Sequence, residues 1–152
     1  MNQTAPPTGP RISAETVHAS TVAIDGRAVL IQGPSGSGKS DLALRLLDRG
    51  FTLVSDDQTT VKRDGSRLIA SSPPTIAGKL EIRGIGIVEV ETISEVPVAL
   101  LVELTSDIQR LPDDSRERPV LGIPLPLITI DAMTASAPSK VALALDRMGV
   151  KF

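Results

Sequence analysis

A glycine-rich stretch, GPSGSGKS at residues 33–40, is the part of the sequence best suited to chemistry. It has the spacing of a Walker A motif, in which glycines let the backbone wrap around a polyphosphate with several N–H groups pointing inward. Lys39 is expected to contact the β- and γ-phosphates, and the Ser40 hydroxyl to ligate Mg²⁺. The predicted nucleotide-binding residues are therefore Gly33, Pro34, Ser35, Gly36, Ser37, Gly38, Lys39 and Ser40.

Two adjacent acids, Asp56 and Asp57, follow the short apolar run FTLVS at residues 51–55. At the carboxyl end of a strand they are expected to lie beside the phosphate loop. Adjacent carboxylates there can divide two tasks, one holding the magnesium ion and the other accepting a proton from an attacking hydroxyl. The alternative is a solvated pair of turn residues.

The elements around the loop have the order that a Walker A motif needs. The apolar run AVLIQG leads into it, and SDLALRLLDRG follows as an amphipathic helix that Gly50 is placed to end. The preceding segment ETVHASTVAI pairs with AVLIQG through a hairpin turn at Asp25-Gly26. A second hairpin, TTVKRDGSRLIA, is predicted to turn at Asp64-Gly65.

The remainder of the chain adds more strand than a minimal nucleotide-binding fold needs. GKLEIRGIGIVEV indicates a strand broken by a functional loop, and VPVALLVEL and IPLPLITI are strands. QRLPDDSRERP is predicted to be a charged loop and SAPSKVALALDRMG a terminal helix, with Pro138 near its first turn. We expect one α/β domain with a mixed, strand-rich sheet over residues 14–152, after a flexible leader at residues 1–13.

Composition excludes several classes of function. With 41% hydrophobic and 22% charged residues, the chain is typical of a soluble globular protein. The absence of cysteine excludes thiol nucleophiles and zinc–thiolate sites. A net charge of −2 and only two aromatic residues argue against nucleic acid as a partner. No apolar run is long enough to span a membrane, and a cytoplasmic location is expected.

Several of these features together resemble one family. They are His18 ahead of the first hairpin, GPSGSGKSDLALRLLDRG, the strand ending in SDD, and LEIRGIGIVEV. The chain resembles the catalytic domain of bacterial HPr kinase/phosphorylase from Val17 to Val90, and more weakly through Ile130. The resemblance implies a P-loop domain related to phosphoenolpyruvate carboxykinase, in a short form that consists of the C-terminal catalytic domain only.

The resemblance implies a role for each matching residue. Ser40 and Glu81 match Mg²⁺ ligands, and Lys39 matches the lysine that contacts phosphate. Asp57 matches the residue that acts as base in phosphorylation and as acid in the reverse reaction, and His18 matches a catalytic-site histidine. The alternatives are a packed core histidine and, for Glu81, the solvent side of a half-buried strand.

A catalytic arginine is also implied by the family. Arg110, within DIQRLP, occupies the matching place, and Arg116 and Arg118 compete with it for this role. The family's basic loop P-x-R-P-G-R-N has no counterpart here, because residues 129–140 are TIDAMTASAPSK. This departure leaves open the reverse reaction, phosphorolysis, and the hexamer that the family implies.

The expected activity is transfer of the γ-phosphoryl group of ATP to a serine of the phosphocarrier protein HPr, with Mg²⁺ as cofactor. One alternative is a P-loop kinase acting on a small molecule, with RLPDDSRER as its lid. Another is a non-catalytic nucleotide-binding regulatory protein. A GTPase is disfavoured because no N-K-x-D motif is present.

Overall fold

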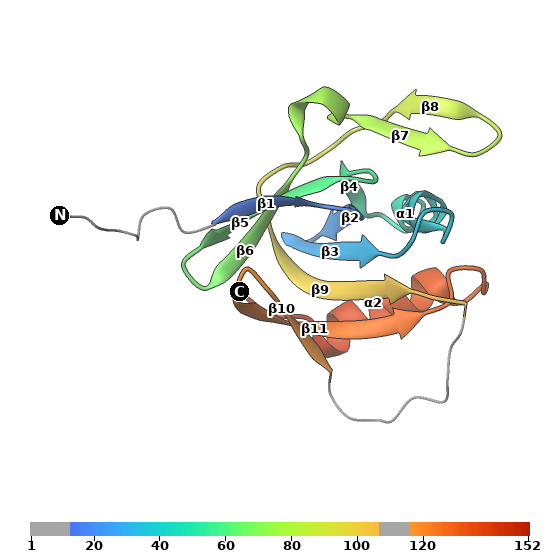
Figure 1. Cartoon of the computed structure of the whole chain (residues 1–152). Coiled ribbons are helices and arrows are strands. Elements are labelled where there is room, and N and C mark those ends of the chain that lie inside the picture. Colours follow the sequence, from blue (N-terminus) through green and yellow to red (C-terminus); the bar gives the residue numbers. More distant parts are fainter. Residues whose placement is uncertain (1–12, 107–115) are drawn as a thin grey trace.

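The computed structural model describes residues 13–106 and 116–152. Arg110 and, except for Ser13, the predicted leader lie outside these residues. In the described part the chain forms a large mixed sheet, a separate hairpin and two helices that cover one face of the sheet (Figure 1).

The elements follow one another in the order shown in Figure 1. The strands are β1 (Ala14–Val17), β2 (Ala19–Ile24), β3 (Arg27–Gln32), β4 (Thr52–Ser55), β5 (Thr59–Asp64), β6 (Arg67–Ser71), β7 (Lys79–Ile82), β8 (Gly86–Glu89), β9 (Val96–Leu104), β10 (Glu117–Val120) and β11 (Ile123–Ile130). The helices are α1 (Lys39–Leu47), a short 3-10 turn (Pro74–Ile76) and α2 (Ala137–Met148).

The long strand β9 organises the main sheet. Along one edge it pairs in parallel with β3, and along the other its first residues pair with β6 and its last residues, in parallel, with β11. Strand β2 lies between β3 and β4 and is antiparallel to both, so β4 runs in the same direction as β3. The carboxyl ends of β3, β4, β9 and β11 therefore meet at one edge of the sheet, which is where ligands bind in open α/β sheets.

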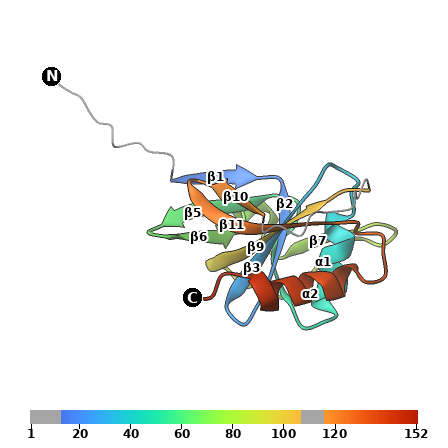
Figure 2. The same ribbon diagram turned by 90° about the horizontal axis from the view of Figure 1, so that it is seen from below.

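Both faces of the sheet are buried, which explains the nearly continuous apolar sequence of β9. On one face Val29, Ile31 and Val102 pack with apolar residues of α1 and α2. On the other face Leu30 and Leu101 pack against residues of the β-rich part of the chain. Figure 2 shows the two helices next to each other on the first face.

The segment GKLEIRGIGIVEV forms a hairpin of its own, with β7 antiparallel to β8. It is a sheet separate from the main one and stands beside α1 (Figure 1). Leu80 attaches it, because this side chain is fully buried in the core beneath the helices. The predicted interruption is thus the turn of a hairpin, and the turn carries Ile85, which is 73% exposed.

Most local predictions are confirmed, with three corrections. His18 does not lie within a strand but in the bend between β1 and β2, where the chain passes from one strand partner to another. The second hairpin turns at Gly65-Ser66 rather than one residue earlier, because Asp64 pairs with Arg67. The predicted charged loop ends earlier than expected, since Glu117–Val120 form β10 against β11.

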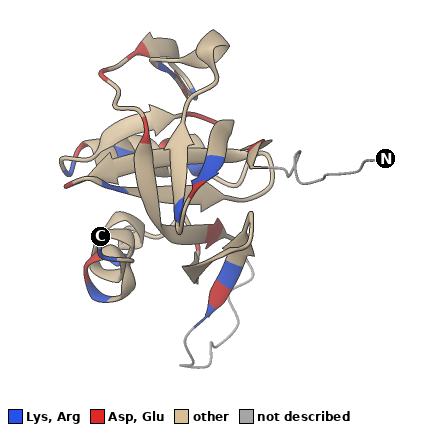
Figure 3. Ribbon diagram, turned by 90° about the vertical axis from the view of Figure 1, so that its left-hand side faces the viewer, with Lys and Arg blue, Asp and Glu red and all other residues tan. Residues whose placement is uncertain are grey.

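Two general properties follow from the described residues. Neither of the two helices they contain is long and apolar enough to cross a membrane. Acidic and basic side chains are interspersed over the ribbon, as Figure 3 shows, in keeping with the small net charge.

Candidate active site

The glycine-rich loop connects β3 to α1 as the sequence predicts. Gly36 and Gly38 have φ of 81° and 101°, a left-handed backbone that glycine adopts without strain. Gly38 is the N-cap of α1, and no side chain caps this end of the helix. The free N–H groups and the positive end of the helix dipole therefore face the loop, which is a suitable arrangement for binding a phosphate.

Lys39 closes the loop from the inside. Its Nζ donates hydrogen bonds to the carbonyl oxygens of Gly33, at 2.9 Å, and Pro34, at 3.2 Å. The residue is 5% exposed, so its charge is held within the loop rather than in solvent. The ammonium group of Lys39 is thus bound by the carbonyl oxygens of the loop itself.

Asp56 is buried and accepts three hydrogen bonds. The hydroxyls of Ser40, at 2.6 Å, and Ser20, at 2.9 Å, both donate to Oδ1, and the backbone N–H of Glu81 donates to Oδ2 at 3.1 Å. Ser20 is fully buried and Asp56 is 6% exposed. This carboxylate therefore connects β2, α1 and the β7–β8 hairpin. Its predicted role as a metal ligand stays a prediction.

Asp57 has the opposite environment, with its side chain 60% exposed. His18 lies next to it, with Nε2 2.8 Å from Oδ1. A carboxylate only accepts hydrogen bonds, so in a contact with a carboxylate Nε2 is the donor. The φ of Asp57 is 69°, unusual for a residue other than glycine, and its N–H donates to Ser20 Oγ at 3.0 Å. Such backbone strain clusters at functional sites.

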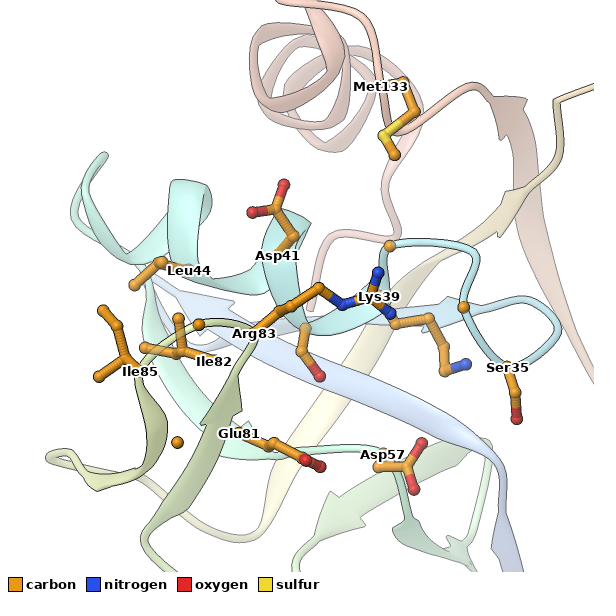
Figure 4. A pocket seen from close by; sticks show the side chains of 15 residues that line it. Ser35, Lys39, Asp41, Leu44, Asp57, Glu81, Ile82, Arg83, Ile85 and Met133 are labelled. Carbon is orange, nitrogen blue, oxygen red and sulfur yellow. The ribbon is translucent and has the colours of Figure 1, made fainter.

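A pocket of about 940 Å³ brings most predicted residues together. Figure 4 shows Glu81 and Asp57 on one side and Lys39 and Ser35 near the loop. The residues that line the pocket are Ser35, Gly36, Gly38, Lys39, Ser40, Asp41, Leu44, Asp57, Glu81, Ile82, Arg83, Gly84, Ile85, Gly86 and Met133.

The two competing arginines that the structure describes lie elsewhere. Arg118 contacts Gln32 Oε1 at 3.2 Å and Glu103 Oε1 at 2.8 Å. Arg116 donates to Thr129 Oγ1 at 3.2 Å. Neither lines the pocket. Arg110, the third candidate, lies outside the described residues.

Eight pocket residues were not among the predicted site residues: Asp41, Leu44, Ile82, Arg83, Gly84, Ile85, Gly86 and Met133. In Figure 4 the side chain of Arg83 extends from the end of β7 toward the glycine-rich loop. Leu44 could have been found from its helical spacing, one turn beyond Ser40. Met133 carries no comparable signal, because it follows β11, far along the chain.

The oxygen atoms in this pocket suit magnesium. Ser40 and Glu81 offer a hydroxyl and a carboxylate, and Mg²⁺ is usually held by one or two carboxylates together with substrate phosphates and water. Within residues 13–106 and 116–152, no three His, Asp or Glu side chains are grouped so as to hold a metal by themselves. An ion at this place would therefore share its coordination with a bound phosphate.

The sequence of this chain is similar to proteins of one known family. Residues 12–144 match the family described as HPr Serine kinase C-terminal domain. The chain is 35% identical to the HPr kinase/phosphorylase of Clostridium botulinum over 133 residues, which are 79% of this chain and 44% of that protein. It is 38% identical to the protein of the same name from Ralstonia nicotianae over 134 residues, 79% of this chain and 41% of that protein. The chain thus spans less than half the length of these relatives.

A solved structure agrees with the sequence comparison. The HPr(Ser) kinase/phosphatase from Coxiella burnetii superposes with a TM-score of 0.77 and 32% identity, over 87% of this chain and 88% of that one. The strand-rich mixed α/β fold is therefore the fold of that kinase structure. With its matched residues extending over most of its length, the chain belongs to the HPr serine kinase C-terminal domain family.

Proposed function

We propose that this protein is an ATP- and Mg²⁺-dependent protein-serine kinase whose substrate is the phosphocarrier protein HPr. The observation that carries the proposal is the pocket in which Lys39, Ser40, Glu81 and Asp57 meet, with His18 hydrogen-bonded to Asp57. These groups supply a phosphate cradle, ligands for a metal ion and a base. Membership of the family and the names of the relatives support the choice of substrate.

In the proposed reaction the loop holds the β- and γ-phosphates. Lys39 exchanges the carbonyls of Gly33 and Pro34 for phosphate oxygens and so offsets the charge of the transferred group. Mg²⁺, held by Ser40 and Glu81, supplies further positive charge when it is bound. To ligate the ion, the Ser40 hydroxyl would present a lone pair of its oxygen to it, in addition to or in place of its hydrogen bond to Asp56.

Asp57 acts as the base. As the serine oxygen of HPr bonds to the γ-phosphorus, the bond from that phosphorus to the β–γ bridging oxygen breaks and ADP leaves with the electron pair. The serine proton passes to Asp57, whose carboxylate His18 orients through the 2.8 Å hydrogen bond. The reverse reaction, in which inorganic phosphate takes the phosphoryl group from phosphoserine and gives pyrophosphate, would use the same atoms in the opposite order.

Exposure of the base favours a protein substrate over a small molecule. The side chains of Asp57 and His18 are 60% and 48% exposed, so a hydroxyl carried on the surface of another protein can reach them. A kinase for small metabolites needs its acceptor enclosed, since water at an open site would compete for the phosphoryl group.

The test compares wild-type protein with Asp57→Asn, incubated with ATP, Mg²⁺ and HPr, by mass spectrometry of HPr. Loss of the base is expected to slow transfer by about 10²- to 10⁴-fold while ATP binding is retained. Asp25→Asn is the matched control, because Asp25 is also an exposed aspartate with positive φ, at the far end of β3 from the loop. It is expected to leave transfer unchanged.

The possible results separate the alternatives. Near-normal transfer by Asp57→Asn would show that this residue is not the base. Labelling of small metabolites but not of HPr would indicate a small-molecule kinase. ATP binding without transfer to either would indicate a regulatory protein. A repeat with phosphorylated HPr and inorganic phosphate tests the reverse reaction, and size-exclusion chromatography with light scattering tests the expected hexamer.

A further inference from the structure

The pocket has two chemically different ends. In Figure 4, Ser35, Lys39 and Asp57 lie toward one side, and Leu44, Ile82 and Ile85 lie toward the other. Leu44 belongs to α1 and the two isoleucines to the β7–β8 hairpin. Met133, from the turn between β11 and α2, lines the pocket apart from them, and in Figure 4 it lies on the opposite side of Asp41 and Lys39 from Glu81 and Asp57. Ile85 is 73% exposed and Met133 76%, so both present apolar surface that nothing in the described chain covers.

The glycine-rich loop sets the direction of a bound nucleotide. Lys39 contacts the β- and γ-phosphates in a Walker A loop, and the proposed base, Asp57, must lie beside the γ-phosphate. The remainder of the nucleotide then extends away from Asp57, past the first turn of α1. Asp41 lies in that turn and lines the pocket, and Leu44 follows it three residues later.

We propose that Met133 binds the base of the nucleotide, on the side of the pocket away from Glu81 and Asp57. This inference rests on the proposed function, because it requires a nucleotide in the loop. The two ends belong to one continuous pocket of about 940 Å³. On the side away from the catalytic acids the pocket wall carries Met133, against whose side chain one face of a planar ring can pack.

No aromatic side chain is available to recognise the base in this pocket. The chain has two phenylalanines and no tyrosine or tryptophan. Phe51 is 6% exposed within the core, and Phe152 lies under the guanidinium of Arg67, 4.8 Å from it. Neither lines the pocket, so the base cannot stack on an aromatic ring. The polarizable sulfur of a methionine makes favourable contacts with aromatic rings and can take the place of one.

Met133 is held in position by its own turn. Its N–H donates to Asp131 Oδ1 at 2.8 Å, and Arg45 on α1 donates to the carbonyl oxygens on either side of it, those of Ala132 and Thr134. Ala132 is buried and packs against the start of α1, where a Cβ on Gly38 would approach it to 3.1 Å. The turn is therefore fixed to the same helix end that holds the phosphates, and Met133 is placed before the ligand arrives.

The test separates binding of the base from binding of the phosphates. Wild-type protein, Met133→Ala and Met148→Ala are titrated with Mg²⁺–ATP and with Mg²⁺–tripolyphosphate, which lacks the nucleoside, by isothermal calorimetry. Removal of about 60 Å² of apolar contact is expected to weaken ATP binding by Met133→Ala about tenfold. Tripolyphosphate binding should be unchanged. Met148, a methionine on α2 that is 49% exposed and outside the pocket, is the matched control and should change neither affinity.

Each other result has a defined meaning. Equal weakening of both ligands by Met133→Ala would show that Met133 supports the loop rather than the base, and would overturn the inference. So would an unchanged affinity for ATP, or a wild-type protein that binds ATP no more tightly than tripolyphosphate. If wild-type protein binds neither ligand, the proposed function is wrong and the inference falls with it.

Discussion

Replacing Asp56 by alanine is predicted to destabilise the protein, whereas replacing its neighbour Asp57 is not. Asp56 is 6% exposed and accepts hydrogen bonds from Ser20, Ser40 and the backbone of Glu81. Removing a buried acceptor leaves its donors without partners, and each such donor costs about 1–3 kcal/mol.

The magnitude depends on which donors can find another partner. Ser40 is partly exposed and can turn to water. Ser20 is fully buried, and its hydroxyl also accepts the N–H of Asp57, so its proton has no obvious alternative acceptor. If Ser20 loses its acceptor completely and Ser40 and the Glu81 N–H lose theirs in part, the free energy of unfolding falls by about 2–4 kcal/mol. For a domain of this size that lowers the melting temperature by about 5–15 °C.

The assay is chemical and thermal unfolding of Asp56→Ala and Asp57→Asn beside wild type. Asn is chosen at position 57 because it tolerates the positive φ that the backbone adopts there. The ion pair of Asp57 with His18 is solvent-exposed, so its loss is expected to change the unfolding free energy by less than about 1 kcal/mol. If Asp56→Ala unfolds within about 1 kcal/mol of wild type, the reasoning from buried hydrogen bonds is refuted.

Two further predictions concern the loop and the base. In Gly33→Ala the new Cβ would lie 2.6 Å from Ser37 Oγ, and the variant should lose about 1–3 kcal/mol of stability, part of which the added change Ser37→Ala restores; a double variant as unstable as the single one would contradict this. Because apolar contacts discriminate weakly between polar ring edges, ATP and GTP should bind within about tenfold of each other in calorimetric titrations, and a larger preference would point to polar groups that read the base.

The sequence predicts the local part of the site well. The loop between β3 and α1 depends on neighbouring residues, and its glycines, lysine and helix appear in order along the chain. Asp56 and Asp57 can also be recognised in the sequence, since they are two acids that directly follow a short apolar strand. Local propensity and hydrophobic period determine these features, so a single sequence contains them.

The long-range part could not be predicted in the same way. Ser20 meets Asp56 only because β2 pairs with β3 and β4 at once, which depends on the order of strands in the sheet. Met133 reaches the pocket because β11 lies parallel to β9 and ends at the same edge as β3. Strand order is set by packing of the whole domain. Neither the sequence of β2 nor that of β11 indicates which strand lies beside it.

The environments of the two adjacent acids indicate which one can be the base. Asp56 accepts two hydrogen bonds at Oδ1 and one at Oδ2, and at 6% exposure its side chain is poorly accessible to a hydroxyl carried by another protein. Asp57 has one side-chain partner, His18, and faces the pocket. A proton can therefore reach Asp57 without disturbing the structure around it. The buried acid holds Ser40, Ser20 and the hairpin in place, and in the proposed mechanism the exposed acid takes the serine proton without disturbing these contacts.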